Sequence, residues 1–128
     1  MARILIIDDE TAVCATAKII LEADGFEVAT VNDGPAGIEA IKNGPFDLVI
    51  CDLFLPKMNG LDVARAIRKI KLDMPIITAS GFMFAGNTQQ MPNFDAMAAE
   101  AGVNATLYKP FKRKDLLQAI RNVLPVAA

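Results

Sequence analysis

The sequence predicts an α/β fold in which a doubly wound, five-stranded parallel sheet is covered by helices on both faces. Short apolar runs rich in β-branched residues recur along the chain, and a stretch with helical periodicity follows each of them. The runs are almost continuously apolar, which is typical of strands buried on both faces of a parallel sheet. Strands that alternate with helices form right-handed crossovers, and such crossovers join parallel neighbours.

Five segments have the composition of strands. They are residues 3–7 (RILII), 27–31 (EVATV), 47–51 (DLVIC), 75–79 (PIITA) and 105–108 (ATLY). With five strands, the common doubly wound order is 2-1-3-4-5, as in flavodoxin-like (βα)5 domains, and its direction changes between strands 1 and 3. Ligands of such sheets bind beyond the carboxyl ends of the strands at that change of direction. We therefore expect a site there.

Helical patterns follow the strands in turn, at residues 12–24, 34–43, 61–71, 95–102 and 113–124. The first places Ala17 and Leu21 on one face, and Gly25 marks its end. The segment 81–94 is long for a βα connection, which commonly has about 2 to 6 residues. We expect it to be a long, mobile loop, with Asn93 as a candidate cap of the helix that follows.

Composition limits the possible functions. The 128 residues fit one domain (1–128). The net charge is −2, and the only basic cluster is the KRK stretch at 112–114. Nucleic-acid binding depends on neutralising phosphates, so we expect none by this domain alone. No apolar run has the length of a membrane span, and the N-terminus lacks the features of a signal peptide. We expect no membrane contact and a cytoplasmic location.

Cysteine and histidine usage argues against two classes of site. The two cysteines, Cys14 and Cys51, have no metal-ligand spacing, and the chain contains no histidine. A zinc site is therefore not expected, and we expect both cysteines to be core residues. The absence of histidine also removes the Ser-His and Cys-His nucleophile systems.

Polar side chains stand at the carboxyl ends of four predicted strands. They are Asp8, Asp9 and Glu10 after strand 1, Asp52 after strand 3, Ser80 after strand 4 and Lys109 after strand 5. Strands 1 and 3 are expected neighbours, so their carboxylates share one crevice. Two unit charges about 4 Å apart repel by about 4 kcal/mol at an effective dielectric near 20, so the cluster needs a cation. Lys109 offsets one charge, and oxygen ligands of this kind suit Mg²⁺.

A carboxylate beside Mg²⁺, a hydroxyl and a lysine favours phosphoryl transfer with an aspartate as nucleophile. In this interpretation Asp52 is exposed at a strand end so that it can be phosphorylated. Lys109 holds the phosphoryl oxygens, and Ser80 donates to one of them after transfer. Taken singly, the acids could favour a helix start, Asp52 and Ser80 could form turns, and Lys109 could be solvated. Their joint occurrence at four strand ends favours the site.

At these motifs the sequence closely resembles the receiver domain of two-component response regulators, including the chemotaxis regulators, over essentially its whole length. The matching stretches are the acidic pair Asp8-Asp9 after RILII, DLFLPKMNG at 52–60, the hydroxyl residue of PIITASG at 75–81, and KPF at 109–111. The resemblance implies that Asp52 accepts a phosphoryl group from a phosphohistidine of a histidine kinase or histidine phosphotransfer protein. The domain then acts as a signalling switch on an unknown downstream protein target, and it catalyses its own phosphotransfer and dephosphorylation.

The resemblance also implies the roles of the remaining site residues. Asp9, Asp52 and the backbone carbonyl of Phe54 ligate Mg²⁺, and Asp8 reaches the ion through water. Lys109 pairs with the phosphoryl oxygens, across a cis bond to the proline that follows it. The switch hydroxyl is that of Ser80 rather than Thr78, because Ser80 ends the strand.

The sequence departs from the family pattern in three places. The family often has a switching aromatic residue three positions before the lysine, and here that position is Thr106. Tyr108 is adjacent to Lys109, so we expect it on a different face. The long loop after strand 4 is expected to remodel the family's usual output surface. Finally, Phe54 and Phe82 flank the phosphorylation site, and either they exclude the water that hydrolyses the acyl phosphate or they simply pack against the long loop.

Two interpretations from other classes stay open. One is a receiver-like protein-binding module that is not phosphorylated, for which Thr106 and the long loop leave room. The other is a Mg²⁺-dependent phosphatase of the aspartyl-phosphate type, but Phe54 stands where that class has its second carboxylate. The chain is either a complete protein or a receiver cut from a larger regulator, and its start directly before strand 1 favours the former. The KRK cluster could meet an acidic partner, although a solvated surface cluster is the preferred interpretation.

Overall fold

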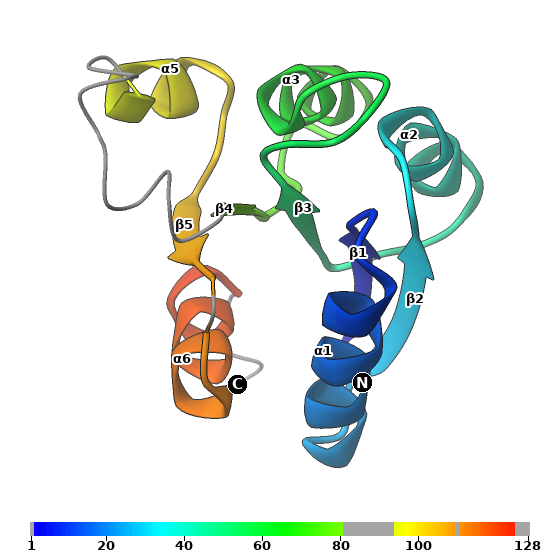
Figure 1. The fold of residues 1–128 in the computed structure, drawn as a ribbon. Helices are drawn as coiled ribbons and strands as arrows, with labels where there is room; N and C mark the ends of the chain where they lie inside the picture. Colours follow the sequence, from blue (N-terminus) through cyan, green and yellow to red (C-terminus); the bar gives the residue numbers. More distant parts are fainter. Residues whose placement is uncertain (1, 81–93, 110, 125–128) are drawn as a thin grey trace.

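The chain folds around one five-stranded parallel sheet with the order β2-β1-β3-β4-β5 (Figure 1). We describe it from a computed structural model that covers residues 2–80, 94–109 and 111–124. The strands are β1 (Arg3–Ile7), β2 (Glu27–Val31), β3 (Leu48–Asp52), β4 (Ile76–Ser80) and β5 (Ala105–Tyr108). The predicted fold class is confirmed, and the change of direction falls between β1 and β3 as expected.

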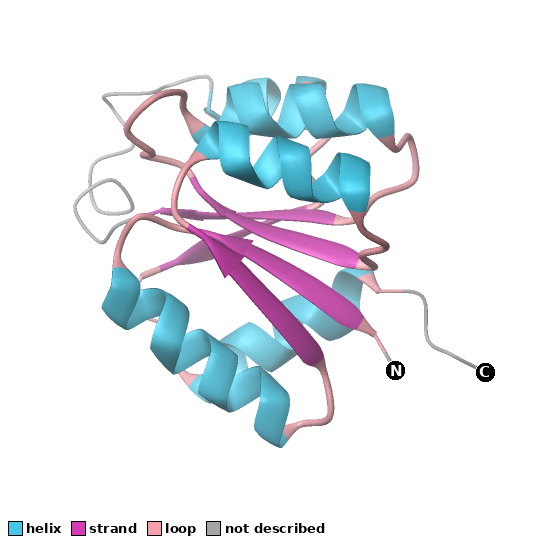
Figure 2. Ribbon diagram, turned by 90° about the vertical axis from the view of Figure 1, so that its right-hand side faces the viewer, coloured by secondary structure: helices cyan, strands magenta, loops and turns pink. Residues whose placement is uncertain are grey.

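Helices cover both faces of the sheet (Figure 2). They are α1 (Thr11–Ala23), α2 (Gly34–Asn43), α3 (Gly60–Ile70), α5 (Phe94–Glu100) and α6 (Arg113–Val123). One face carries α2, α3 and α5, and the other carries α1 and α6 (Figure 1). Among the described residues, none of these helices is both long enough and apolar enough to span a membrane.

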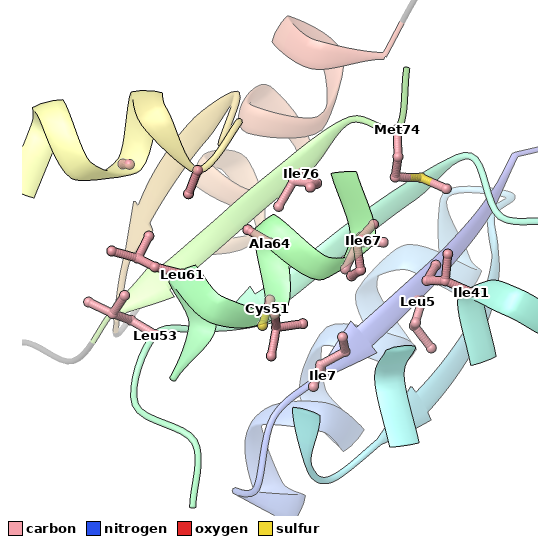
Figure 3. Close-up of a cluster of buried hydrophobic side chains, with 14 residues drawn as sticks. Leu5, Ile7, Ile41, Cys51, Leu53, Leu61, Ala64, Ile67, Met74 and Ile76 are labelled. Carbon is pink, nitrogen blue, oxygen red and sulfur yellow. The ribbon is translucent and has the colours of Figure 1, made fainter. Parts of the chain in front are cut away.

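The core consists of two apolar layers that share the central strands. Leu5 and Ile7 of β1 belong to the layer under α2, α3 and α5 (Figure 3), whereas Ile4 and Ile6 belong to the layer under α1 and α6. All four side chains are buried. Because successive residues of a strand point to opposite faces, a strand covered on both faces must be apolar at nearly every position. This is why the predicted strands read as continuous apolar runs.

Two strands lie one residue later than predicted, and the shift matters for the site. Pro75 has no N–H to donate, so it stands just outside β4, with its carbonyl accepting from Val49 N at 3.0 Å. At the other end, Leu53 N donates to Ala79 O at 2.7 Å and prolongs the pairing of β3 with β4. Asp52 and Ser80 are therefore the last residues of their strands, which confirms that they stand at the carboxyl ends.

The predicted end of the first helix is confirmed at Gly25, which has a φ of +94°. Gly25 N donates to Glu22 O and Phe26 N donates to Leu21 O, each at 3.1 Å. This pair of hydrogen bonds is the Schellman motif, which requires a left-handed residue that glycine adopts without strain. The chain therefore turns directly from α1 into β2.

The predicted helix at 95–102 is shorter than expected. Helix α5 ends at Glu100, and the chain turns at Gly102, which has a φ of +84°. The predicted long loop at 81–94, its cap Asn93 and Phe82 fall almost entirely outside the described residues, so the expectations about them stay predictions.

Candidate functional site

Three carboxylates converge where β1 and β3 end side by side. The parallel register pairs Ile7 with Cys51, so Asp8 and Asp52 follow at the same edge of the sheet. Carboxylate oxygens of Asp8, Asp9 and Asp52 all lie within 4.8 Å of one another. Asp8 and Asp52 are buried, and Asp9 is exposed. The predicted sharing of one crevice is thus what the sheet order produces.

Asp52 is buried, with 4% of its surface exposed, so the expectation of an exposed aspartate is wrong. The strand that carries Asp52 extends one residue further than predicted, so Asp52 is part of the buried sheet. Its Oδ1 accepts a long hydrogen bond of 3.4 Å from Phe54 N and lies 3.4 Å from Lys109 Nζ. A buried carboxylate is tolerated when it is paired in this way.

Lys109 supplies the positive charge of the cluster. Its Nζ lies 2.7 Å from Asp8 Oδ2, 3.4 Å from Asp52 Oδ1 and 3.7 Å from Glu10 Oε1. Only 11% of its side chain is exposed. Its backbone N–H donates to Ser80 O at 2.7 Å, which continues the pairing of β4 with β5. The site therefore joins β1, β3 and β5 through one ammonium group.

The charges shift the proton affinities of the site. Burial raises the pKa of the Asp52 carboxyl, and the charge of Asp8 raises it further, to about 6 against the opposing effect of Lys109. Burial lowers the pKa of Lys109, but the hydrogen bond and charge of Asp8, together with Asp52 and Glu10, outweigh it, so this pKa is raised above 10.5. At neutral pH the aspartate is largely ionised and the lysine is charged.

Ser80 lies on β4, one strand beyond Asp52, and its hydroxyl is fully buried. Within the described part of the chain, Ser80 Oγ has no hydrogen-bond partner. Asp52 is paired with Ala79 in the register, so the Ser80 side chain leaves the sheet on the opposite face from Asp52. Sequence position alone placed Ser80 at the site, and the structure gives no direct contact between Ser80 and the carboxylates.

Thr106 occupies the position that the family often fills with an aromatic residue, and it is half-buried. It pairs with Thr78 in the register of β4 and β5, and the two hydroxyl oxygens are 3.5 Å apart. Tyr108 pairs with Ser80 and stands two residues after Thr106, so the two residues lie on the same face of β5. Its side chain is partly exposed.

The connection from β3 to α3 is shaped by the stretch that contains Asn59 and Gly60. Asn59 caps α3 by accepting from Asp62 N at 2.9 Å, and Gly60 N donates to Leu53 O at 2.8 Å. A Cβ on Gly60 would lie 2.5 Å from Asp52 O and 2.8 Å from Leu53 Cα. Only glycine lets the start of α3 approach the backbone that carries Asp52 this closely.

Phe54 lies in this connection, with 52% of its surface exposed. A ligand role for its backbone carbonyl stays a prediction. The expected cis bond after Lys109 and the ring of Phe82 both involve residues outside the described ranges, so these expectations remain untested. The effect of the two phenylalanines on hydrolysis also stays a prediction.

Sequence reasoning missed the role of Glu10. It grouped Glu10 with the two aspartates as part of an acidic run, whereas the structure turns its side chain to Lys109. Nothing in the spacing of residues reveals this, because the contact depends on where β5 delivers Lys109. A groove of about 560 Å³, lined among others by Asp8, Thr11 and Asn32, opens beside the cluster and leaves space next to α1.

The donor set fits a hard divalent cation. Asp8, Asp9 and Asp52 cluster together, whereas a single lysine pairs with only Asp8 and Asp52 of the three, which leaves excess negative charge at the site. All the donors are oxygens, and this favours Mg²⁺ over softer metals. With a cation bound, Asp52 would have a neutralised environment in which it can act as a nucleophile toward a phosphoryl group.

Known proteins are similar to this chain over most of its length. The family model of the response regulator receiver domain matches residues 4–121. The DNA-binding response regulator MtrA of Mycolicibacterium paratuberculosis is 33% identical over 120 residues, which are 93% of this chain and 49% of MtrA. The chain therefore spans about half the length of the curated relatives it matches.

Two solved structures are similar over nearly the whole chain. A response regulator receiver domain protein from Clostridium thermocellum has a TM-score of 0.81 and 34% identity, covering 96% of this chain and 94% of that chain. The response regulator TrrA of Thermotoga maritima, solved in complex with Mg²⁺ and BeF, has a TM-score of 0.80 and 29% identity, covering 97% of this chain and all of TrrA (100%).

Proposed function

We infer the function from the premise that this chain belongs to the response regulator receiver domain family, whose model spans residues 4–121. A receiver is a phosphorylation-activated switch of two-component signalling. We propose that Asp52 is the residue phosphorylated in this domain. The observation that carries the proposal is the placement of Lys109 Nζ between Asp8 and Asp52, at 2.7 and 3.4 Å. A buried aspartate that shares a lysine with a second carboxylate has the charge arrangement that a phosphoryl acceptor needs.

In the proposed reaction, an oxygen of Asp52 attacks the phosphorus atom of the donor. The new O–P bond forms as the bond from phosphorus to the leaving group breaks, and the leaving group departs with the electron pair of that bond. The Lys109 ammonium, whose raised pKa keeps it charged, donates to the oxygens of the transferred group. In hydrolysis, water attacks the phosphorus atom, the bond from phosphorus to Asp52 breaks, and inorganic phosphate leaves as the carboxylate is restored. The domain is proposed to promote both its own phosphorylation and its own dephosphorylation.

Mg²⁺ fits the proposal as the resident cation. Asp8, Asp9 and Asp52 would hold it together with the backbone carbonyl of Phe54, and Asp8 would contact it through water. When bound, the ion neutralises the charge that phosphoryl transfer concentrates at the site. The oxygen-only donor set supports this assignment, as does the Mg²⁺ complex of TrrA, which is similar to this chain.

Ser80 is proposed as the hydroxyl that responds to phosphorylation. Its buried Oγ lacks a partner in the described part of the chain, and a buried polar group without a partner costs free energy. A donor position toward a phosphoryl oxygen would remove that cost, provided that β4 or its neighbours rearrange. Thr106 cannot supply the ring movement of an aromatic residue, so the response is proposed to reach the surface by a different path.

The proposed partners follow from the same chemistry. The phosphoryl donor is a histidine kinase or a histidine phosphotransfer protein, and the acceptor of the signal is a downstream protein target. The role is signalling rather than metabolic catalysis. The domain itself is proposed to bind no nucleic acid, since the name of MtrA as a DNA-binding regulator describes a protein about twice as long.

Phosphorylation can be tested by intact mass after incubation with acetyl phosphate, with and without Mg²⁺. We expect the native chain to gain one phosphoryl group only with Mg²⁺, and Asp52→Asn to gain none. Asp73→Asn, which removes an exposed aspartate from the turn before β4, is the matched control and should behave as the native chain.

Failure of phosphorylation would favour the interpretation of the chain as a receiver-like protein-binding module. Absence of phosphorylation together with absence of Mg²⁺ binding would contradict the proposed switch, because a degenerate acidic pocket has no need of the ion. Turnover of small phosphomonoesters would instead revive the phosphatase interpretation.

A further inference from the structure

Lys109 is shared by three carboxylates, and the third of them has no place in the proposed reaction. Asp8 and Asp52 are buried ligands of the proposed cation site. Glu10 comes from the start of α1, and 62% of its side chain is exposed. Its Oε1 nevertheless lies 3.7 Å from Lys109 Nζ. An exposed glutamate that turns inward to a nearly buried lysine calls for a physical reason.

The backbone position of Glu10 does not supply that reason. Glu10 is the N-cap residue of α1, where Asp, Asn, Ser and Thr are preferred because their short side chains accept from the first turn of the helix. The Glu10 side chain makes no such capping hydrogen bond. Its backbone N–H is satisfied by Asp8 Oδ1 at 2.9 Å, which holds the residue against the site. The side chain thus reaches the lysine instead of capping the helix.

We propose that Glu10 is a positioning residue that competes with the incoming phosphoryl group for the Lys109 ammonium and thereby slows phosphorylation of Asp52. This inference rests on the proposed function. An ammonium group has three donors and no acceptor. Among the described residues the Lys109 ammonium pairs with Asp8 and Asp52 at 2.7 and 3.4 Å, and with Glu10 at 3.7 Å, beyond hydrogen-bond distance, so Glu10 acts through its charge. Incoming phosphoryl oxygens must therefore compete with the attraction of these carboxylates for the ammonium group.

Glu10 is the partner that must give way. A bound cation can satisfy Asp8 and Asp52, because their oxygens belong to the cluster around it. Glu10 is not part of that cluster, so its only short-range ion pair among the described residues is with Lys109. Its charge therefore stays at the mouth of the site and opposes the transfer of Lys109 to the phosphoryl oxygens.

The test compares two substitutions that separate the charge of the Glu10 side chain from its length. Glu10→Gln keeps the size of the side chain and removes its charge. Glu10→Asp keeps the charge, but it shortens the side chain by one methylene and offers a good helix cap, so the carboxylate should leave Lys109. Glu27→Gln is the matched control, because it removes an exposed glutamate at the start of β2, at the opposite edge of the sheet.

The measurement is the rate of Asp52 phosphorylation by acetyl phosphate at saturating Mg²⁺, followed by intact mass over a range of donor concentrations. We expect both Glu10 variants to raise the phosphorylation rate at low donor concentration by about two- to fivefold, the range of an exposed ion pair, through a lower half-saturating donor concentration. Glu27→Gln should match the native chain. Thermal unfolding of each variant shows whether the fold is retained, and a merely structural role would not lower the half-saturating donor concentration.

Three results overturn the inference in distinguishable ways. Equal rates in native protein and both Glu10 variants would show that Glu10 does not compete for Lys109. Acceleration by Glu10→Gln alone would assign the effect to charge at the mouth rather than to the position of that charge beside the lysine. If no variant and no native protein is phosphorylated at Asp52, the proposed function itself fails and this inference fails with it.

Discussion

At the scale of single residues, the charges of the site lower the stability of the folded chain. Asp52 is ionised, buried and next to a second buried carboxylate, and Lys109 compensates only part of this repulsion, since the pKa of Asp52 remains raised to about 6. A residue selected for packing would avoid such a position. The cost is understandable if the carboxylate serves a reaction, because active sites retain unfavourable charges that the reaction uses.

Replacing Asp52 by an uncharged residue should remove this cost and so raise the stability of the fold. We expect Asp52→Asn to raise the free energy of unfolding at pH 7 without Mg²⁺ by about 1 to 3 kcal/mol, because it removes a buried charge whose pKa is shifted upward. Urea unfolding of the two proteins measures the difference. Asp73→Asn, an exposed control, should change the free energy by less than about 0.5 kcal/mol.

The pH dependence of this gain has a definite sign. The folded pKa of Asp52, about 6, lies above its ordinary value of 3.8, so the folded state binds the proton more tightly than the unfolded state. The native chain therefore loses stability as pH rises between these values. The advantage of Asp52→Asn should be complete above about pH 6 and absent below 3.8. An advantage that grows toward acidic pH would contradict the assigned cause.

At the scale of elements, the connection between β3 and α3 holds the nucleophile in place. Gly60 lies against the backbone of Asp52 and Leu53, and Lys57 in the same connection forms an ion pair of 3.3 Å with Asp33, the cap of α2. The exposed ion pair contributes little to stability. The close backbone approach at Gly60 is the stricter requirement, because no side-chain rotation can relieve it.

Gly60→Ala should therefore affect both stability and the site. We expect a loss of about 1 to 3 kcal/mol in the free energy of unfolding, as for an overpacked core, and slower phosphorylation because the added methyl group displaces the Asp52 carbonyl. Urea unfolding and intact mass measure the two effects. At Gly44 the added Cβ would come no closer than 3.3 Å to Phe46, so Gly44→Ala is the control and should leave phosphorylation unchanged. Equal effects of the two substitutions would refute the role assigned to Gly60.

At the scale of the whole molecule, three strands that are distant in sequence unite at one edge of the sheet. The order β2-β1-β3-β4-β5 places β1 beside β3, and Lys109 reaches across from the end of β5 to Asp8. Any ligand held by these segments links them together. Its binding free energy should therefore stabilise the fold as a unit.

Mg²⁺ should raise the stability of the native chain in proportion to its binding. At a free concentration ten times its Kd, the expected gain is about 1.4 kcal/mol, observed as a higher Tm. Asp9→Asn should lose this response, since it removes one of the three clustered carboxylates. Asp62→Asn, which alters an exposed carboxylate on α3, should keep it. KCl at matched ionic strength controls for screening, and an equal rise of Tm in KCl would exclude specific binding.

The sequence by itself determined the strands, the helices, their order and the clustering of acidic residues with Lys109. It could do so because apolar periodicity reports burial on each face, and because parallel strands deliver their carboxyl ends to one edge. Tertiary structure alone decided three features of the site. Asp52 is buried, the Ser80 side chain lies on the opposite face of the sheet from Asp52, and the Glu10 side chain turns to Lys109. These features depend on strand ends that shift by one residue and on side chains that meet from distant segments. Spacing along one segment does not encode either of them.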